Sequence, residues 1–255
     1  HWHGRKSRMK VTYLSHHGDD LLVANAARAS FDKQSTAFCA ADERLLAFLA
    51  RGLTADAYDN VLELLAAAKD KTEVKAVLPL LQKEKHFAPF CHPHLTVRVT
   101  APLAIARQMW KSHIGGYMTE GIKGDGWSET SLRYVEANEA YMPDVVRKQA
   151  ANIKQGSSKE TIPTPGYYSS SVGASLFAYE ELLKDGVCRE QARMVLPAAT
   201  MTTWVWTGSL LFFARVCRLR LEEHAQLEAQ ELTQQLADIV KELWPVSYKY
   251  LVEEA

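Results

Sequence analysis

The sequence predicts a single α+β domain. Short segments with the alternation of strands are separated by longer segments whose apolar residues recur at helical spacing. With 255 residues, the chain can bury a sizeable core without disulfides or metals. It has no internal repeat and no low-complexity segment, so one domain is the simplest architecture. Residues 1–8 precede Met9 and read as a tag or a disordered basic tail, which leaves 9–255 as the domain.

The N-terminal part is predicted to be one strand followed by helices. The strand is 9–14, whose Val, Thr and Tyr side chains suit a pleated sheet. Acidic residues open the next segment, 19–31, and its apolar residues have helical spacing. The segment 41–52 predicts a short amphipathic helix that ends at its glycine, and 55–81 predicts one or two more with solvated faces.

A strand that leads directly into a helix is predicted in the middle of the chain. The residues 94–100 alternate as a strand, and Pro102 opens the helix because its missing N–H costs nothing there. Polar side chains follow at four-residue spacing along one face of this helix: Arg107 with Lys111, and Gln108 with Ser112.

The C-terminal half is predicted to be mostly helical. The segment 162–171 is rich in Pro, Gly and Ser and predicts a connection, whereas 174–186 predicts an amphipathic helix closed by a glycine. A short helix is expected over 187–197, a strand over 200–208, and helix in one or two pieces over 209–244. Two pairs are expected to share a helix face: Arg189 with Arg193, and Arg220 with His224.

Composition excludes several classes of protein. Thirty basic and thirty acidic side chains cancel, which argues against a general nucleic-acid or membrane binder. The longest nearly apolar run, 204–216, is shorter than the roughly 20 residues that a membrane helix requires. The cysteines are scattered without a C-x-x-C pair, which fits a reducing cytoplasm: they are Cys39, Cys91, Cys188 and Cys217.

Two further patterns are assigned no chemistry. Adjacent histidines, at 16–17 and at 92 and 94, are poor chelators without a further ligand at helical spacing, so no metal site is predicted. The glycine-rich "GIKGDG" lacks the order of a phosphate-binding loop and is interpreted as a mobile insertion over an active site.

Three segments together resemble the flavin-dependent thymidylate synthases: 86–113, 128–134 and 188–230. "ARMVLP" and "LRLEEHAQ" reproduce two motifs of that family nearly verbatim. Its central signature, R-H-R followed after seven residues by S-x-R, is altered here. Lys111, Ser112 and His113 stand at R-H-R, and an apparent insertion, 118–127, precedes the resumed motif. The resemblance implies an antiparallel sheet flanked by helices, a long C-terminal helical region, and a homotetramer with active sites where chains meet.

The resemblance implies transfer of a one-carbon unit from methylenetetrahydrofolate to C5 of a pyrimidine nucleotide. dUMP would become dTMP, with FAD supplying hydride after reduction by NADPH. Arg220 is implied to stabilise negative charge on the pyrimidine, and Ser131 to bind rather than attack, since no general base is evident beside it. The implied nucleotide ligands are Gln108, Glu129, Ser131, Arg133, Arg193 and Arg220. The guanidinium forks of Arg133 and Arg193 suit phosphate or carbonyl oxygens, and Glu129 is implied to have a supporting hydrogen-bonding role.

The implied flavin ligands include several departures from the family. Cys91 stands where a glutamate is usual, Ser209 replaces an asparagine and Leu211 replaces an arginine. Lys111 keeps a positive charge without the guanidinium fork, and His113 replaces an arginine only when protonated. The expected cofactor-binding residues are His86, Lys111, Ser112, His113, Ser209, Arg215 and His224.

The altered signature leaves alternatives open. One is a variant that acts on UMP or dCMP, or that releases a hydroxymethylated product. Another is a nucleotide-binding homologue that has lost flavin and catalysis, because the changes at Cys91, Ser209 and Leu211 remove familiar flavin contacts. A purely structural subunit would leave the three arginines at matching positions unexplained.

Overall fold

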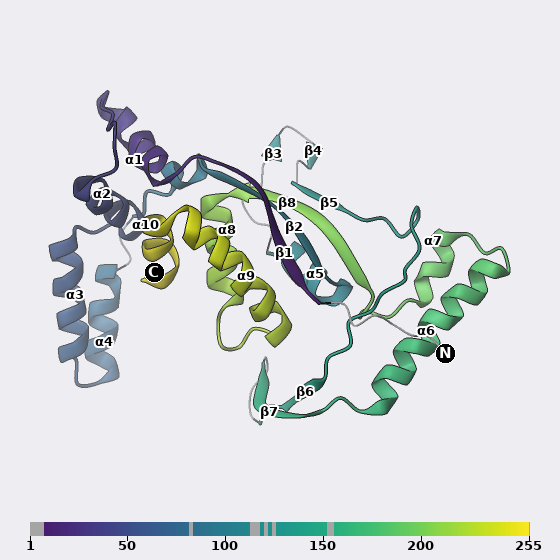
Figure 1. Cartoon of the computed structure of the whole chain (residues 1–255). Helices are drawn as coiled ribbons and strands as arrows, with labels where there is room; N and C mark the ends of the chain where they lie inside the picture. The colour runs from purple at the N-terminus through teal and green to yellow at the C-terminus, as the bar shows by residue number, and fades with distance from the viewer. Residues whose placement is uncertain are drawn as a thin grey trace. The chain divides into compact units, whose positions relative to one another are not determined.

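The computed structural model describes residues 8–81, 84–112, 126–151 and 156–254, together with the backbone of 118–119 and 122–123. The chain divides into two compact units. The first comprises His1–Leu14, Thr96–Thr207 and Leu219–Leu236, and the second comprises Ser15–Leu95, Gly208–Arg218 and Ala237–Ala255. Figure 1 labels their elements.

A four-stranded sheet lies mainly in the first unit. Its order is β1-β2-β8-β5, so strands far apart in the sequence become neighbours. Strand β5 runs antiparallel to β8, with Trp127 opposite Trp206 and Glu129 opposite Trp204. The strands are β1 (Lys10–His17), β2 (His94–Pro102), β5 (Trp127–Glu129) and β8 (Met201–Ser209).

The two central strands show why their sequences form sheet. In β2 the apolar Leu95, Val97 and Val99 are buried and alternate with more exposed residues, as the two-residue period of a strand requires. Threonines on the other face pair across the strands. Thr96 and Thr207 hydroxyls lie 3.0 Å apart, and those of Thr100 and Thr203 lie 2.9 Å apart.

The remaining elements of the first unit precede or follow these strands along the chain. A hairpin of two antiparallel strands precedes the long helix α6 (Figure 1). Helix α9 begins in the first unit and ends in the second. The elements are α5 (Leu103–Trp110), β3 (Met118–Thr119), β4 (Ile122–Lys123), β6 (Val145–Gln149), β7 (Ser157–Pro163), α6 (Gly166–Lys184), α7 (Arg189–Ala192), a 3-10 turn (Arg193–Val195) and α9 (Leu227–Leu243).

Helix α6 anchors the segment that follows β5. Tyr179 of α6 is buried against Ala137 and Ala192, and its hydroxyl accepts the Ala137 N–H at 3.4 Å. Leu132 packs against the same cluster. Farther along, the Tyr141 N–H donates to the Ala199 carbonyl at 2.8 Å. The segment 132–141 is therefore fixed between α6 and the residues that enter β8.

The second unit is mainly helical. Helices α3 and α4 form a pair in it (Figure 1). Helix α8 also belongs to this unit except for its last two residues. Its elements are α1 (Asp20–Arg28), a 3-10 turn (Ala29–Phe31), α2 (Ala40–Arg51), α3 (Ala55–Ala67), α4 (Lys71–Val77), further 3-10 turns (Leu78–Leu81 and Ala88–Cys91), α8 (Leu210–Arg220), α10 (Pro245–Tyr248) and a π-helical turn (Lys249–Glu253).

Two buried carboxylates organise this unit. Asp20 accepts the backbone N–H groups of Val246 and Ser247 at 2.9 and 3.0 Å, so α1 caps the start of α10; burial nevertheless raises the pKa of Asp20. Asp42 is fully buried and accepts from Arg28 at 2.6 Å. Burial alone would raise the pKa of Asp42, but its hydrogen bonds outweigh that effect and lower the pKa.

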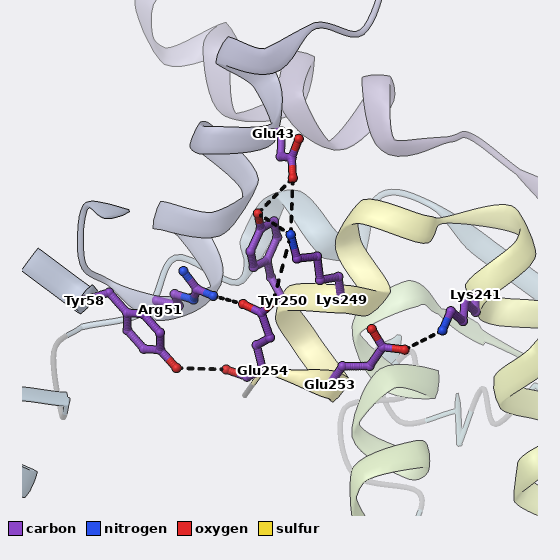
Figure 2. Close-up of polar contacts among 8 residues, drawn as sticks. All are labelled: Glu43, Arg51, Tyr58, Lys241, Lys249, Tyr250, Glu253 and Glu254. Carbon is purple, nitrogen blue, oxygen red and sulfur yellow. Dashed lines mark hydrogen bonds and ion pairs between the residues drawn. The ribbon is translucent and has the colours of Figure 1, made fainter. Parts of the chain in front are cut away.

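A polar network joins the C-terminal turn to α2 and α3 (Figure 2). The Arg51 guanidinium lies 3.9 Å from the ring centre of Tyr58 and 4.7 Å from that of Tyr250, and it forms an ion pair with Glu254. The Tyr250 hydroxyl donates to Glu43 at 3.0 Å. These contacts hold the turn Lys249–Glu253 against α2.

The structure confirms the predicted α+β fold with antiparallel strands and a long C-terminal helical region. The prediction of a connection over 162–171 is wrong, because β7 extends to Pro163 and α6 begins at Gly166. Pro163 is the last residue of the strand, whereas Pro165 and Gly166 stand at the start of the helix, where proline is tolerated. No helix within the described ranges is long and apolar enough to cross a membrane.

Candidate active site

The candidate site centres on Arg220, the last residue of α8. Its Nε donates to Ser112 Oγ at 3.0 Å, and its Nη2 donates to the same oxygen at 2.9 Å and to the Gln108 carbonyl at 2.7 Å. Burial lowers the pKa of Arg220, but a guanidinium stays charged at neutral pH. The structure thus brings together three of the predicted site residues.

Arg220 meets α5 at its C-terminal end, where the last carbonyls of a helix lack helical partners. The Ser112 N–H bonds to the Met109 carbonyl at 3.0 Å and tightens this turn. The Gln108 carbonyl instead accepts from Arg220, and a cation is favoured at this end of the helix dipole. Arg220 therefore completes α5 and also places a positive charge beside it.

The side chain of Gln108 is held by a residue that the sequence reasoning gave no role. Its amide donates to Gln226 Oε1, and the Gln226 amide donates to Glu228 at 2.9 Å. Gln226 is the last residue of "LRLEEHAQ", so the signal was present in the motif. Two residues of this motif, Arg220 and Gln226, contact Gln108.

The loop between Arg220 and Gln226 is ordered by a side chain of α9. The Gln230 amide donates to the carbonyls of Glu222, Glu223 and Ala225, at 3.1, 3.3 and 2.7 Å. His224 is exposed within this loop. The prediction that Arg220 and His224 share a helix face is therefore wrong, because α8 ends at Arg220.

The hairpin β6–β7 lies against the same loop. Gly156 has φ +105°, a conformation that favours glycine, and a Cβ built there would lie 3.5 Å from the His224 carbonyl oxygen. Lys159 also forms an ion pair with Glu223 at 3.3 Å. Sequence reasoning did not predict this hairpin or its contact with the loop.

Glu129 is fixed from both sides on β5. Its Oε1 accepts from the Thr202 hydroxyl at 2.8 Å and its Oε2 accepts from Trp127 Nε1 at 3.2 Å. Both carboxylate oxygens of Glu129 therefore have donors within the protein, and its role toward a nucleotide stays a prediction. Thr202 and Trp127 were not predicted as site residues.

A tryptophan cluster forms one wall of a cavity beside Glu129. Trp127 stacks on Trp204 with ring centres 4.4 Å apart, and it meets Trp110 edge to face at 5.3 Å. The cavity has a volume of about 310 Å³. It is lined by Leu103, Ala106, Arg107, Trp110, Trp127 and Glu129.

Arg133 and Arg193 lie beside one hydrophobic cluster. Of their sequence neighbours, Ala192 belongs to the buried cluster that contains Tyr179, and Leu132 packs against this cluster. Arg133 and Arg193 are themselves exposed, and Ser131 Oγ accepts from Arg133 Nε at 3.4 Å. Within the described residues, no hydrogen bond or ion pair joins this pair of arginines to Arg220.

The predicted flavin ligands fall into both units. Lys111 and His224, in the first unit, are exposed and have no hydrogen-bond or ion-pair partner for their side chains among the described residues. Such free donors fit the phosphates of an anionic dinucleotide. His113 lies outside the described residues.

Three other predicted flavin ligands belong to the second unit. The His86 ring stacks on Phe48 at 5.6 Å. The Ser209 hydroxyl accepts the Phe212 N–H at 3.2 Å, so it caps the start of α8. Arg215 is exposed on α8.

Residues 12–246 match the family model described as thymidylate synthase complementing protein. A flavin-dependent thymidylate synthase of Thermosipho africanus is 34% identical over 187 residues, which cover 71% of this chain and 78% of the relative. The chain belongs to the flavin-dependent thymidylate synthase family.

Further relatives agree with this assignment. The flavin-dependent thymidylate synthase of Thermosipho melanesiensis is 33% identical over 183 residues, covering 69% of this chain and 75% of the relative. A crystal structure of the UMP/dUMP methylase PolB from Streptomyces cacaoi, bound with 5-Br dUMP, has the same fold: the TM-score is 0.69 at 20% identity, over 96% of this chain and 95% of that one. The predicted family and its thymidylate synthase-like enzyme class are confirmed.

Proposed function

We propose that this flavin-dependent thymidylate synthase relative methylates C5 of a pyrimidine nucleotide, converting dUMP to dTMP in the cytoplasm. Methylenetetrahydrofolate is the proposed one-carbon donor, and FAD reduced by NADPH is the proposed source of hydride. The observation that carries the proposal is the fixed guanidinium of Arg220, anchored through Nε and Nη2 to Ser112 and Gln108.

The residues of this chain have separable tasks in that reaction. Arg220 stabilises negative charge on the pyrimidine, which a preorganised cation does without reorganising during the reaction. The side chains of Gln108 and Glu129 are themselves held in place, because each is hydrogen-bonded to a partner within the unit. Their amide and carboxylate groups therefore have fixed positions. Reduced flavin supplies the hydride when bound, and the exposed Lys111 and His224 are proposed to hold it.

Arg133 and Arg193 are proposed to grip the nucleotide phosphate at a contact between subunits of a homotetramer. Large apolar side chains beside them support such an interface, since Tyr134 is 72% exposed and Met194 is 81% exposed. Arg193 of one chain would then complete the site of another. Because Arg133 and Arg193 lie beside the same cluster of one chain, mixing the inactive variants Arg193→Ala and Arg220→Ala should restore activity; mixed tetramers that stay inactive would refute the shared site.

The activity is tested by product analysis. The protein is incubated with FAD, NADPH, methylenetetrahydrofolate and either dUMP, UMP or dCMP, and the nucleotides are analysed by mass spectrometry. Arg220→Ala should lower kcat for dTMP formation by roughly a hundredfold. Arg98→Ala, which removes an exposed arginine of β2, is the matched control and should retain activity. A methylated product from UMP or dCMP alone, or a hydroxymethylated product, would contradict the proposed substrate and outcome.

A nucleotide-binding homologue without catalysis is the second candidate. Ser209 supports it, because the hydroxyl at this altered position is used to cap α8. In that case the protein would bind dUMP, form no product with any nucleotide, and remain colourless after incubation with FAD.

A further inference from the structure

Ser112 stands at the second position of the family's R-H-R signature, where the family has a histidine. Its side chain is almost fully buried, at 3% exposure. The hydroxyl donates to the Gln108 carbonyl at 3.2 Å and accepts twice from Arg220. A serine hydroxyl has one donor and two acceptor positions, so its hydrogen-bonding capacity is used completely inside the protein.

The contacts anchor one side of the Arg220 guanidinium. Nε and Nη2 are both directed to Ser112 Oγ, and Nη2 also reaches the Gln108 carbonyl. Nη1 has no acceptor in the part of the chain that the structure describes. One edge of a planar, rigid fork is thus held, and the remaining donors are available to a ligand.

We propose that Ser112 is a positioning residue for nucleotide recognition rather than a flavin ligand. Its hydroxyl holds the Nε–Nη2 edge of Arg220 against the end of α5, so that Nη1 is presented to the pyrimidine nucleotide. This role rests on the proposed function, because it takes the nucleotide as the ligand of Arg220. It differs from the flavin-binding role that the family resemblance implies for this position.

The decisive variants are Ser112→Ala, which removes the hydroxyl, and Ser112→Thr, which keeps it. Dissociation constants for dUMP and for FAD are measured separately by titration. Ser112→Ala should weaken dUMP binding roughly tenfold, since hydrogen bonds to a charged group are lost, and should leave FAD binding unchanged. Ser112→Thr should restore dUMP binding. Ser170→Ala, which removes another serine hydroxyl bonded to a helix carbonyl, should change neither constant.

The reverse pattern would overturn the proposal. Weaker FAD binding with unchanged dUMP binding in Ser112→Ala would make the hydroxyl a flavin contact. Unchanged affinity for both ligands would show that Arg220 does not depend on it. In steady-state kinetics, the proposal requires a rise in KM for dUMP that Ser112→Thr reverses.

A second measurement does not depend on activity. Phenylglyoxal modifies accessible arginines, and peptide mass spectrometry reports the rate at Arg220, with Arg147 as the internal reference because it is bonded to backbone carbonyls elsewhere. Ser112→Ala should accelerate modification of Arg220 several-fold relative to Arg147. An unchanged ratio would overturn the proposed anchoring. If the ratio rises but the wild-type protein binds no nucleotide, the proposed function fails while the Ser112–Arg220 contact stands.

Discussion

Asp42 offers a quantitative test of the packing in the second unit. It is fully buried and accepts from the Arg28 Nε and Nη2 at 3.0 and 2.6 Å, from the Ser35 hydroxyl at 3.1 Å and from the Cys39 N–H at 3.0 Å. Asp42→Asn keeps the shape of the side chain but removes its charge. It also replaces one accepting oxygen with an NH2 group, which then faces one of the donors to Asp42. Breaking a buried charge pair costs about 3–5 kcal/mol, and because Arg28 is partly exposed we expect about 3 kcal/mol.

The assay is urea unfolding of the wild type and Asp42→Asn at several pH values. The pKa of Asp42 is lowered in the folded state, so its stabilisation is fully present above the unfolded value of 3.8 and is lost as pH falls through the folded value. The difference between the two proteins should therefore be constant near neutral pH and shrink only under acidic conditions. Asp59→Asn, on an exposed position of α3, should leave the free energy of unfolding unchanged. Equal stability of wild type and Asp42→Asn at pH 7 would refute the reasoning.

Three further predictions concern other parts of the structure. Arg51→Met should lower the free energy of unfolding by about 2 kcal/mol, measured by urea denaturation, because it removes the stacked cation and its ion pair; an unchanged midpoint would refute the network in Figure 2. Thr202→Val should cost about 1 kcal/mol and change the tryptophan fluorescence, since Glu129 loses a donor beside the tryptophan cluster; an identical spectrum and stability would contradict this. Burial raises the pKa of Cys217 to about 12, so iodoacetamide at pH 8 should label the exposed Cys188 and spare Cys217 in native protein. Rapid labelling of Cys217 would show that α8 is packed differently.

The strands and helices that bury an apolar face could be predicted from the sequence. Strand β2 is an example, because Leu95, Val97 and Val99 alternate with polar residues and all three are buried. Strands β6 and β7 could not be predicted, because their residues are mostly polar and stay exposed or half-buried, which leaves no two-residue apolar period to detect.

The candidate site, like the fold, could be predicted only in part from the sequence. Motif matches were enough to select Gln108 and Arg220, but not the contact between them, because 112 residues separate the two in the chain. The role of Ser112 follows only from that contact. Thr202 and Gln226 were missed for a related reason: each acts by holding another site residue, and this depends on which strands and loops become neighbours.

The most direct test of the central claim is the visible spectrum of the purified protein with added FAD, recorded while dUMP, UMP and dCMP are titrated in turn. A flavin-dependent pyrimidine methyltransferase should bind FAD. Added dUMP should perturb the flavin absorbance band, and this perturbation should saturate as dUMP is titrated. Failure to bind FAD in the presence of any of the three nucleotides would contradict the proposed reaction.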